Sequence, residues 1–325
     1  MAHLTHLVVH HVHRRIRAYV LGGILVLALI VYLFLLPPLH FPKGETIEVR
    51  EDATFDETAE VLEARGVVRS ALLFKAVARI GQADRAVQAG RYYFEHPEGM
   101  TSVLYRLVQG ITGIPSVRVT FPEGYTVREM VLVLEEALPE FDTDTFYEEA
   151  LSFEGYLFPD TYLVPFDATA TELVSRMRAT FDTRMTSLDD VLPLSSRSLD
   201  QIVTMASILE KEAKTEEDMR IVSGILWDRI EIGMALQVDA VFGYIKGVDT
   251  YHPSGEDLEI DSPYNTYMHR GLPPTPIGNP GLTAIRAALS PTHTEYLYYL
   301  TGRDGQMYYA KTFEEHKENR DRYLD

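Results

Sequence analysis

One glutamate lies in a segment whose other side chains predict a buried helix. Residues 205–213 read MASILEKEA, and Glu210 is the first of two glutamates in that stretch. A carboxylate in an apolar helix is unfavourable unless it is paired, protonated or used in chemistry. Glu210 is therefore a candidate general acid or base, and the alternative is a structural ion pair at a domain interface.

Helical spacing separates Glu210 from the second carboxylate, Glu212. At about 100° per residue, the apolar residues that follow Ile202 cover an arc of roughly 220°, which predicts a well-covered helix. Ser198 is placed to cap this helix, with Gln201 at the reciprocal position of a capping box. Glu210 lies beside small side chains, whereas Glu212 lies about 200° away from it around the helix. We therefore expect that the two carboxylates cannot face one pocket, and the small neighbours favour Glu210 as the functional one.

A long uncharged run near the N-terminus predicts a membrane anchor. As a helix, residues 18–36 span roughly 28 Å, which matches a hydrocarbon core of about 30 Å. Three arginines precede the run and only Lys43 follows closely, so residues 1–17 are expected in the cytoplasm and the remainder outside the cell (inner) membrane. A cleaved signal peptide is the alternative, but the run exceeds the usual ~7–15 residues and no small-x-small site follows.

The composition narrows the range of partners and cofactors. The chain has 48 acidic and 30 basic residues, a net charge of −18, which argues against a nucleic-acid partner. It has no cysteine, which excludes disulfides and thiol catalysis. Among the N-terminal histidines, the helical spacing of His6, His10 and His13 would suit a metal site. No Cys or carboxylate completes such a site, so we expect a solvated tail and neither metal nor cofactor. The histidines of this tail are His3, His6, His10, His11 and His13.

A weak repeat of strand, acidic turn, threonine and helix occupies residues 44–138. Its predicted strands are residues 47–49, 92–94 and 117–119, and its threonines are Thr54, Thr101 and Thr126. Each threonine is placed to cap the amphipathic helix that follows, and the first and third also have the spacing of capping boxes. Units this small cannot bury a core alone, so we expect one compact α+β module, followed by a mixed α+β domain over residues 139–325.

Two segments rich in glycine, proline, tyrosine and amides are candidates for lining a cleft. Residues 154–162 read EGYLFPDTY and predict an extended segment that either lines a cleft or only enters the domain. Residues 262–281 contain SPYNTY and GLPPTPIGNPG, which is incompatible with regular structure. Tyrosine rings and amides suit a sugar site. A rigid structural loop is the alternative.

The remaining segments predict ordinary elements. Helices are expected over residues 168–185 and 284–289, and a hairpin joins residues 296–300 and 306–310. The last helix begins near residue 312. His316 in it could reach the site, but we expect it to be a capping or surface residue.

Together, these motifs resemble the MltG (YceG-like) endolytic murein transglycosylases over essentially the whole chain. The resemblance is carried by the anchor, the threonine-capped repeats, EGYLFPDTY at 154–162, ASILEKE at 206–212, LQVD at 236–239, YNTY at 264–267, and GLPP through NPG at 271–281. It implies a LysM-like module over residues 44–138 and a catalytic domain over residues 139–325. It also implies that Glu210, the first glutamate of Glu-Lys-Glu, is the catalytic acid.

The sequence departs from the family pattern at two places. The family commonly has Ser or Thr and then Asp-Pro after the glutamine, whereas Gln237 is followed here by Val238, Asp239 and Ala240. The glycine that commonly follows Leu-Pro-Pro is Thr275 here. These departures concern loop shape and subsites more than the class of reaction.

The resemblance implies a lyase that cleaves nascent peptidoglycan between MurNAc and GlcNAc, leaves 1,6-anhydroMurNAc ends and so terminates glycan elongation. Its partners would be glycan strands, the cell membrane and peptidoglycan synthases. Ordinary glycosidases use two carboxylates, whereas this reaction needs one, because the substrate's C6 hydroxyl is the nucleophile. We expect Glu210, with a raised pKa, to act first as acid and then as base. The residues expected to bind the glycan are Glu154, Gln237, Asp239, Tyr264, Asn265 and Tyr267.

Two other functions remain open. A conventional muramidase would use Glu154 or Asp239 as a second carboxylate. A non-catalytic scaffold would bind peptidoglycan and its synthases without cleaving the glycan.

Overall fold

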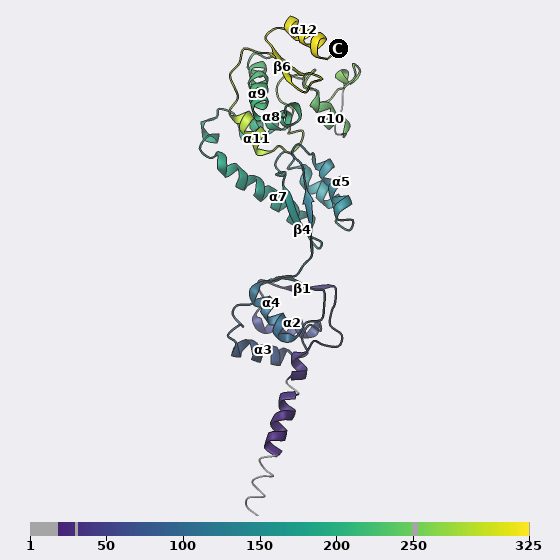
Figure 1. Cartoon of the computed structure of the whole chain (residues 1–325), viewed down its shortest axis with the longest axis vertical. Coiled ribbons are helices and arrows are strands. Elements are labelled where there is room, and N and C mark those ends of the chain that lie inside the picture. Colours follow the sequence, from purple (N-terminus) through teal and green to yellow (C-terminus); the bar gives the residue numbers. More distant parts are fainter. Residues whose placement is uncertain (1–18, 30–31, 249–252, 325) are drawn as a thin grey trace, which may run out of the picture. The chain divides into compact units, whose positions relative to one another are not determined.

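The computed structural model describes residues 19–29, 32–248 and 253–324 (Figure 1). The chain divides into two compact units, Met1–Pro115 and Ser116–Asp325. Both units mix helices with short two-stranded sheets, as the α+β prediction requires.

The first unit packs helices around one antiparallel strand pair. Its described elements are β1 (Glu45–Val49), α2 (Phe55–Ala64), α3 (Ala71–Ile80), β2 (Gly90–Phe94) and α4 (Met100–Gln109). Glu45 lies opposite Phe94 in the strand pair, and Val49 lies opposite Gly90. Alternation along the strands turns Ile47 into a core that also contains Phe74 of α3.

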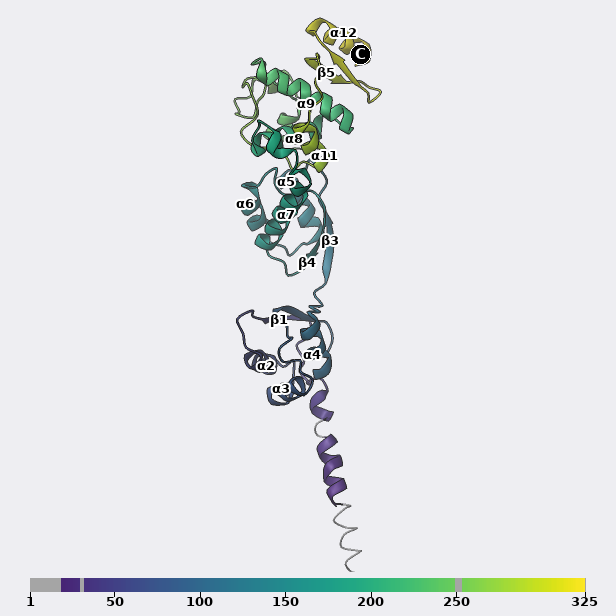
Figure 2. The same cartoon turned by 90° about the vertical axis from the view of Figure 1, so that its left-hand side faces the viewer.

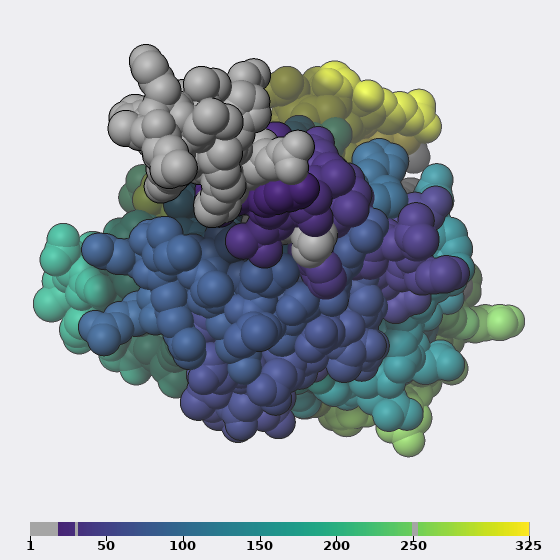
Figure 3. Space-filling view, turned by 90° about the horizontal axis from the view of Figure 1, so that it is seen from below, coloured from purple at the N-terminus to yellow at the C-terminus, as the bar shows by residue number. Residues whose placement is uncertain are grey.

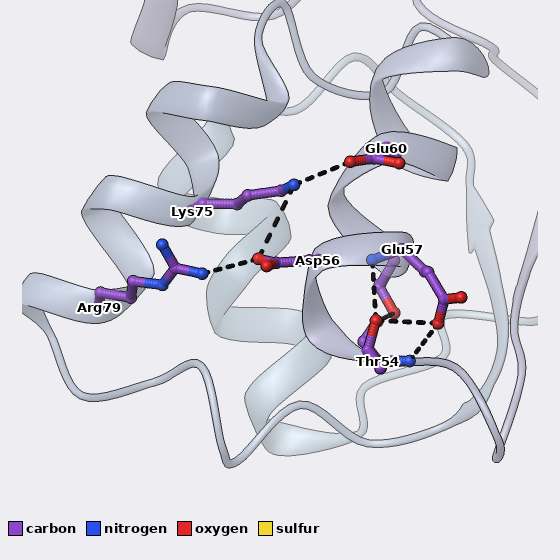
Figure 4. A network of polar contacts seen from close by, with 7 residues as sticks. Thr54, Asp56, Glu57, Glu60, Lys75 and Arg79 are labelled. Atoms are coloured by element: carbon purple, nitrogen blue, oxygen red, sulfur yellow. Dashed lines mark hydrogen bonds and ion pairs between the residues drawn. The ribbon is translucent and has the colours of Figure 1, made fainter.

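A capping box and ion pairs fix the helices of this unit (Figure 4). Thr54 N donates to Glu57 Oε2 at 2.7 Å, and Glu57 N donates to Thr54 Oγ1 at 3.2 Å, which confirms the predicted capping box. Lys75 Nζ lies 3.0 Å from Glu60 Oε1, and Arg79 pairs with Asp56 at 2.8 Å. These pairs join α3 to α2.

The predicted cap at Thr101 is wrong. The N-cap of α4 is Gly99, which makes no side-chain capping bond. A Cβ at Gly99 would lie 2.9 Å from the carbonyl oxygen of Leu35, so the close approach of this backbone favours glycine at the N-cap.

The second unit contains two adjoining cores. Its elements are β3 (Ser116–Thr120), α5 (Val127–Ala137), α6 (Thr143–Leu151), β4 (Thr161–Pro165), α7 (Ala170–Met185), η1 (Thr186–Leu188), η2 (Leu192–Leu194), α8 (Leu199–Glu212), α9 (Glu216–Glu231), α10 (Ala240–Lys246), η3 (Asp257–Glu259), α11 (Leu282–Leu289), β5 (Tyr298–Thr301), β6 (Met307–Ala310) and α12 (Phe313–Tyr323). One core lies among β3, β4 and α5–α7, and the other lies around α8, α9 and α11 (Figure 2).

The third segment of the predicted repeat belongs to this second unit. β3 pairs antiparallel with β4, and Thr120 lies opposite Thr161. The boundary between the units therefore falls at Pro115, whereas the sequence placed it between residues 138 and 139. Pairing with a strand about 40 residues further along overrides the similarity of the three segments.

Among the residues described, no helix has the length and apolar character needed to cross a membrane. Residues 19–29 and 32–35 are helical. The predicted anchor over 18–36 also includes residues 18, 30 and 31, which lie outside the described residues. The predicted tail over residues 1–17, with its histidines, lies outside them as well.

Candidate active site

α8 positions Glu210 in its last turn. Ser198 and Gln201 form the predicted capping box, and every residue from Ile202 to Leu209 is buried. Glu210 is half-buried and accepts a hydrogen bond from Gly281 N at 2.9 Å. Gly281 is the N-cap of α11, so packing between α8 and α11 sets the position of the carboxylate.

Burial raises the pKa of Glu210 to about 6. The bond from Gly281 N opposes this effect, the negative charge of Glu123 adds to it, and Lys211 opposes it. A carboxyl group in this range can hold a proton near neutral pH and can also give it up, as a general acid and base must.

A glycine allows the loop before α5 to approach Glu210 closely. Gly124 has φ +80°, and a Cβ on it would lie 3.2 Å from Glu210 Cγ. Gly124 N donates to Asn279 O at 2.7 Å, which joins the loop before α5 to the loop before α11. The carboxylate therefore lies between two segments that are far apart in the sequence.

A cleft of about 890 Å³ opens beside Glu210. Of the predicted site residues it brings together Glu210, Gln237, Asp239 and Tyr267. Residues that the sequence did not predict also line it: Glu123, Tyr125, Lys211, Glu212, Arg229, Tyr298, Tyr299, His316 and Arg320.

Gln237, Asp239 and Tyr267 form one wall of the cleft. Gln237 has φ +49° and its backbone N donates to Thr266 O at 3.2 Å. Tyr267 Oη donates to Asp239 Oδ1 at 2.6 Å. Between them, Val238 is buried and its N–H donates to Thr266 Oγ1 at 3.0 Å. The departure from the family pattern at Val238 therefore points into the core, while Gln237 and Asp239 remain exposed.

Glu154 lies outside the lining of this cleft. It is only 5% exposed and accepts from Val127 N at the start of α5, with both oxygens at 3.2 Å. Asn279 Nδ2 also donates to it at 2.9 Å. Burial raises the pKa of Glu154 to about 7. These contacts give Glu154 the role of a clamp between loops.

Asn265 and Tyr264 also lie outside the lining. Asn265 is fully buried, and its Nδ2 donates to the carbonyls of Leu258 and Ile260 at 3.0 and 2.9 Å. Tyr264 Oη lies 2.6 Å from the hydroxyl of Thr275, the residue at the family's glycine position. The amide of Asn265 thus holds two backbone carbonyls, and the Tyr264 hydroxyl bonds a side chain of the same loop, as expected of a rigid structural loop.

Glu212 does line the cleft, so the expectation that one pocket cannot receive both glutamates is wrong. α8 ends at Glu212, and the cleft extends around that end of the helix. Tyr299 Oη donates to Glu212 Oε2 at 3.0 Å, and burial raises the pKa of Glu212 to about 7. The two carboxylates nevertheless have different partners.

His316 lines the cleft too, although the sequence predicted a capping or surface role. Its ring stacks on that of Tyr298 with centroids 5.5 Å apart, and the cap of α12 is Thr312. Burial lowers the pKa of His316. The sequence feature that could have indicated this position is the tyrosine-rich hairpin of β5 and β6, because its rings can pack against side chains of the helix that follows.

The described fold and cleft belong to a known class of protein. A model of the YceG-like family matches residues 47–322, so this chain belongs to the YceG-like family. The family predicted from the sequence motifs is thereby confirmed.

Curated relatives carry an enzyme name. A protein of Bacillus subtilis (strain 168) named endolytic murein transglycosylase is 27% identical over 321 residues, which cover 89% of this chain and 88% of that protein. A protein of the same name from Streptococcus pneumoniae serotype 2 is 27% identical over 319 residues, 85% of this chain and 58% of that longer protein. The name describes a lytic transglycosylase, the class that the motifs predicted.

A solved structure supports the fold. The crystal structure of a YceG-like protein from Listeria monocytogenes matches with a TM-score of 0.57 and 27% sequence identity. The match covers 84% of this chain and 98% of that chain.

Proposed function

We propose that this chain is a peptidoglycan lytic transglycosylase that cleaves glycan strands internally, between MurNAc and GlcNAc, with Glu210 as its acid and base. The observation that carries the proposal is a half-buried carboxyl group with a pKa near 6 on the wall of a large cleft. Family membership and the names of the curated relatives support the same reaction.

One carboxyl group accounts for both proton transfers. Glu210 donates its proton to the glycosidic oxygen as the bond from the MurNAc C1 to that oxygen breaks. The carboxylate then accepts the proton of the C6 hydroxyl on the same MurNAc, while O6 bonds to C1. The product is a 1,6-anhydro end, no water is consumed, and Glu210 is protonated again.

The cleft offers side chains for holding the sugars. Gln237 and Asp239 are exposed on its wall, and the Tyr267 hydroxyl is oriented by Asp239. The rings of Tyr125 and Tyr298 also line it, and tyrosine rings pack against the C–H faces of sugars. We assign glycan contacts to these residues, and loop positioning to Glu154, Tyr264 and Asn265.

Of the two carboxylates that a muramidase could use beside Glu210, one lies in the cleft. Asp239 lies in the cleft, whereas Glu154 is buried outside the lining. A muramidase would use Asp239 with Glu210 and give reducing ends in place of anhydro ends.

Replacing Glu210 with Gln tests the proposal. Loss of a general acid is expected to reduce the release of anhydro-ended products by roughly 10²–10⁴-fold. Mass spectrometry of products from nascent, uncross-linked glycan measures this. Glu136→Gln, which changes an exposed glutamate of α5 outside the cleft lining, is the control and should retain the activity.

Three outcomes would point elsewhere. Anhydro-ended products from Glu210→Gln at the wild-type rate would refute the role of Glu210. Reducing ends from the wild type would favour the muramidase. Glycan binding with no product from the wild type would favour a scaffold.

We also propose that residues 18–36 anchor the enzyme in the cell membrane, with the LysM-like module and the catalytic domain outside and residues 1–17 in the cytoplasm. Leu21, Ile24 and Leu25 belong to the described helical residues and expose most of their apolar surface. Such an anchor would hold the cleft near nascent glycan and its synthases, where cleavage terminates elongation. Flotation of the whole chain with lipid vesicles, lost on deletion of residues 18–36, is the expected result.

A further inference from the structure

Glu123, which has no part in the two proton transfers, lies beside Glu210. Gly281 donates its N–H to Glu210 Oε2, and a Cβ on the same glycine would lie 1.9 Å from Glu123 Oε1. The carboxylates of Glu210 and Glu123 therefore both lie against Gly281. The next residue along from Glu123 is Gly124, which lies against the Glu210 side chain.

The charges around Glu210 come from several elements. Glu123 and Lys211 act on Glu210 directly, in opposite directions. The other charged or titratable groups of the cleft lining are Glu212, Arg229, Asp239, His316, Arg320 and the tyrosines Tyr125, Tyr267, Tyr298 and Tyr299. A nearby negative charge makes loss of a proton from a carboxyl group less favourable. Glu123 is the acidic neighbour that acts in this sense on Glu210.

We propose that Glu123 is a positioning residue whose negative charge keeps Glu210 protonated until the glycan is bound. The proposal rests on the proposed role of Glu210 as the acid. Glu123 needs no contact with the reacting atoms for this, because its carboxylate acts across Gly281. Glu210 is therefore one of two neighbouring carboxylates, which are 87 positions apart in the sequence. Of the two, only Glu210 transfers protons in the proposed reaction.

The pH dependence of kcat/KM tests this role. Glu123→Gln removes the charge and keeps the shape, so the alkaline limb of the profile should move to lower pH. For each unit of that shift, the rate above the limb falls about tenfold, while the acidic side changes little. Glu123→Asp should recover part of the shift. Glu136→Gln, on an exposed position of α5, is the matched control and should leave the profile unchanged.

A second variant moves the carboxylate without removing it. A Cβ in Gly281→Ala would displace the Glu123 side chain, and the φ of −76° at this position accepts alanine. Its profile should shift in the same direction, and adding Glu123→Gln should then change little.

Two results would overturn the role of Glu123: an alkaline limb that does not move, or an equal loss of rate at every pH, which would indicate a catalytic or purely structural role. Failure of the proposed function is a separate result, because it would appear as full activity in Glu210→Gln.

A different observation concerns α3, which is apolar on two faces. Ala71, Phe74 and Ala78 are buried in the first unit. On the other side, Leu72 and Ile80 are 78% and 85% exposed, with exposed Ala76 between them. The spacing of four residues makes a stripe along one face. An exposed apolar patch on a folded domain commonly marks a site of contact with another molecule or a membrane.

This stripe begins beside the end of the apolar run. Arg69 donates from Nη2 to the carbonyl oxygen of Pro37 at 2.7 Å, and the next residue, Ser70, is the N-cap of α3. Leu35 packs against the core of the same unit, and Leu39 is 90% exposed. Figure 3 shows the surface of this unit in purple to blue. Lys75 and Arg79 extend toward α2, where they pair with Glu60 and Asp56, while the Arg79 side chain stays 57% exposed (Figure 4).

From this we infer that Leu72, Ala76 and Ile80, together with Leu39, lie in the boundary between headgroups and acyl chains of a bilayer. The inference rests on the proposed anchor, because an anchor that ends at residue 36 brings these side chains to the interface. Apolar residues on one face of a helix bind that layer of a membrane.

Site-specific fluorescence tests this contact, since the chain has no cysteine of its own. The full chain carrying Ile80→Cys, labelled with an environment-sensitive dye, is reconstituted in vesicles of phosphatidylglycerol and phosphatidylethanolamine. Doxyl-labelled lipid should quench this dye strongly. A dye at Asp52→Cys, a polar exposed position of the same unit, should be quenched little.

Equal quenching at both positions, or none at position 80 in protein that floats with the vesicles, would overturn the contact alone. Protein that does not float at all would overturn the anchor, and the contact with it.

Discussion

At the scale of single residues, the proposed chemistry depends on the proton of Glu210. Burial raises its pKa to about 6, so the acid form prevails below that pH and the carboxylate above it. The proposed reaction begins with the acid form. We therefore expect kcat/KM to fall through a limb near pH 6 and then about tenfold for each further pH unit.

The rate of anhydro-end release from nascent glycan, measured from pH 4 to 9, checks this expectation. An activity that rises between pH 7 and 8 would contradict it, because it would require the carboxylate as the starting form. Circular dichroism at each pH controls for unfolding.

Sequence reasoning predicted some of the residues that line the cleft and missed those that only distant contacts bring there. Glu210, Gln237, Asp239 and Tyr267 were predicted and line one cleft. Glu154 and Asn265 have the same suitable functional groups, yet both are buried by loops from elsewhere in the chain. Glu123 was missed because Gly281, a residue 158 positions further on, brings it to Glu210.

At the scale of elements, one amide holds together the loops around the site. Asn279 Oδ1 accepts from the N–H groups of Gly155 and Leu157, both at 2.9 Å. Its Nδ2 donates to Tyr125 O and to Glu154 Oε1, also at 2.9 Å. The loops before α5, before β4 and before α11 thus share one fully buried side chain.

Asn279→Ala should destabilise the second unit. The substitution leaves buried backbone groups without partners, at about 1–3 kcal/mol for each. A lower midpoint of urea unfolding, together with a loss of activity from misplaced loops, is the expected result. Asn319→Ala is the control, because Asn319 makes one bond of 3.3 Å to Tyr309 O near the surface. Equal midpoints for the two variants would contradict the clamp.

Local signals predicted the elements themselves better than their assembly. The capping boxes at Thr54, Thr126 and Ser198 are present, because the interacting groups are three residues apart. The cap at Thr101 and the boundary at residue 138 were wrong. The N-cap is Gly99, whose backbone lies close to Leu35 O, and the pairing of β3 with β4 places the third segment in the second unit.

At the scale of the whole molecule, buried carboxyl groups link the stability of the second unit to pH. Burial raises the pKa of Glu154 and Glu212 to about 7 and that of Glu210 to about 6, from an unfolded value near 4.5. Between pH 4.5 and 7 the folded unit holds protons that the unfolded chain has released. The protonated Glu154, Glu210 and Glu212 contribute fully to the stability of the folded unit below pH 4.5. This contribution is lost as the pH rises through 6 and 7.

Carboxyl groups whose pKa is lowered in the folded unit affect its stability at a lower pH. The ion pair with Arg184 lowers the pKa of Asp160, so its contribution is present above its unfolded value of 3.8 and is lost at lower pH. The net charge of −18 acts in the same direction as the buried glutamates, because repulsion grows as carboxylates ionise.

Trp227 reports this dependence for the second unit alone. It is the single tryptophan of the chain, is buried, and donates from Nε1 to Ala288 O at 3.0 Å. Because two units can unfold separately, its fluorescence follows one transition. We expect a higher urea midpoint at pH 5 than at pH 8. In Glu154→Gln, which resembles the protonated acid, the difference should shrink, whereas in Glu136→Gln it should not. A midpoint that rises with pH would show that the buried carboxyl groups are ionised in the folded unit.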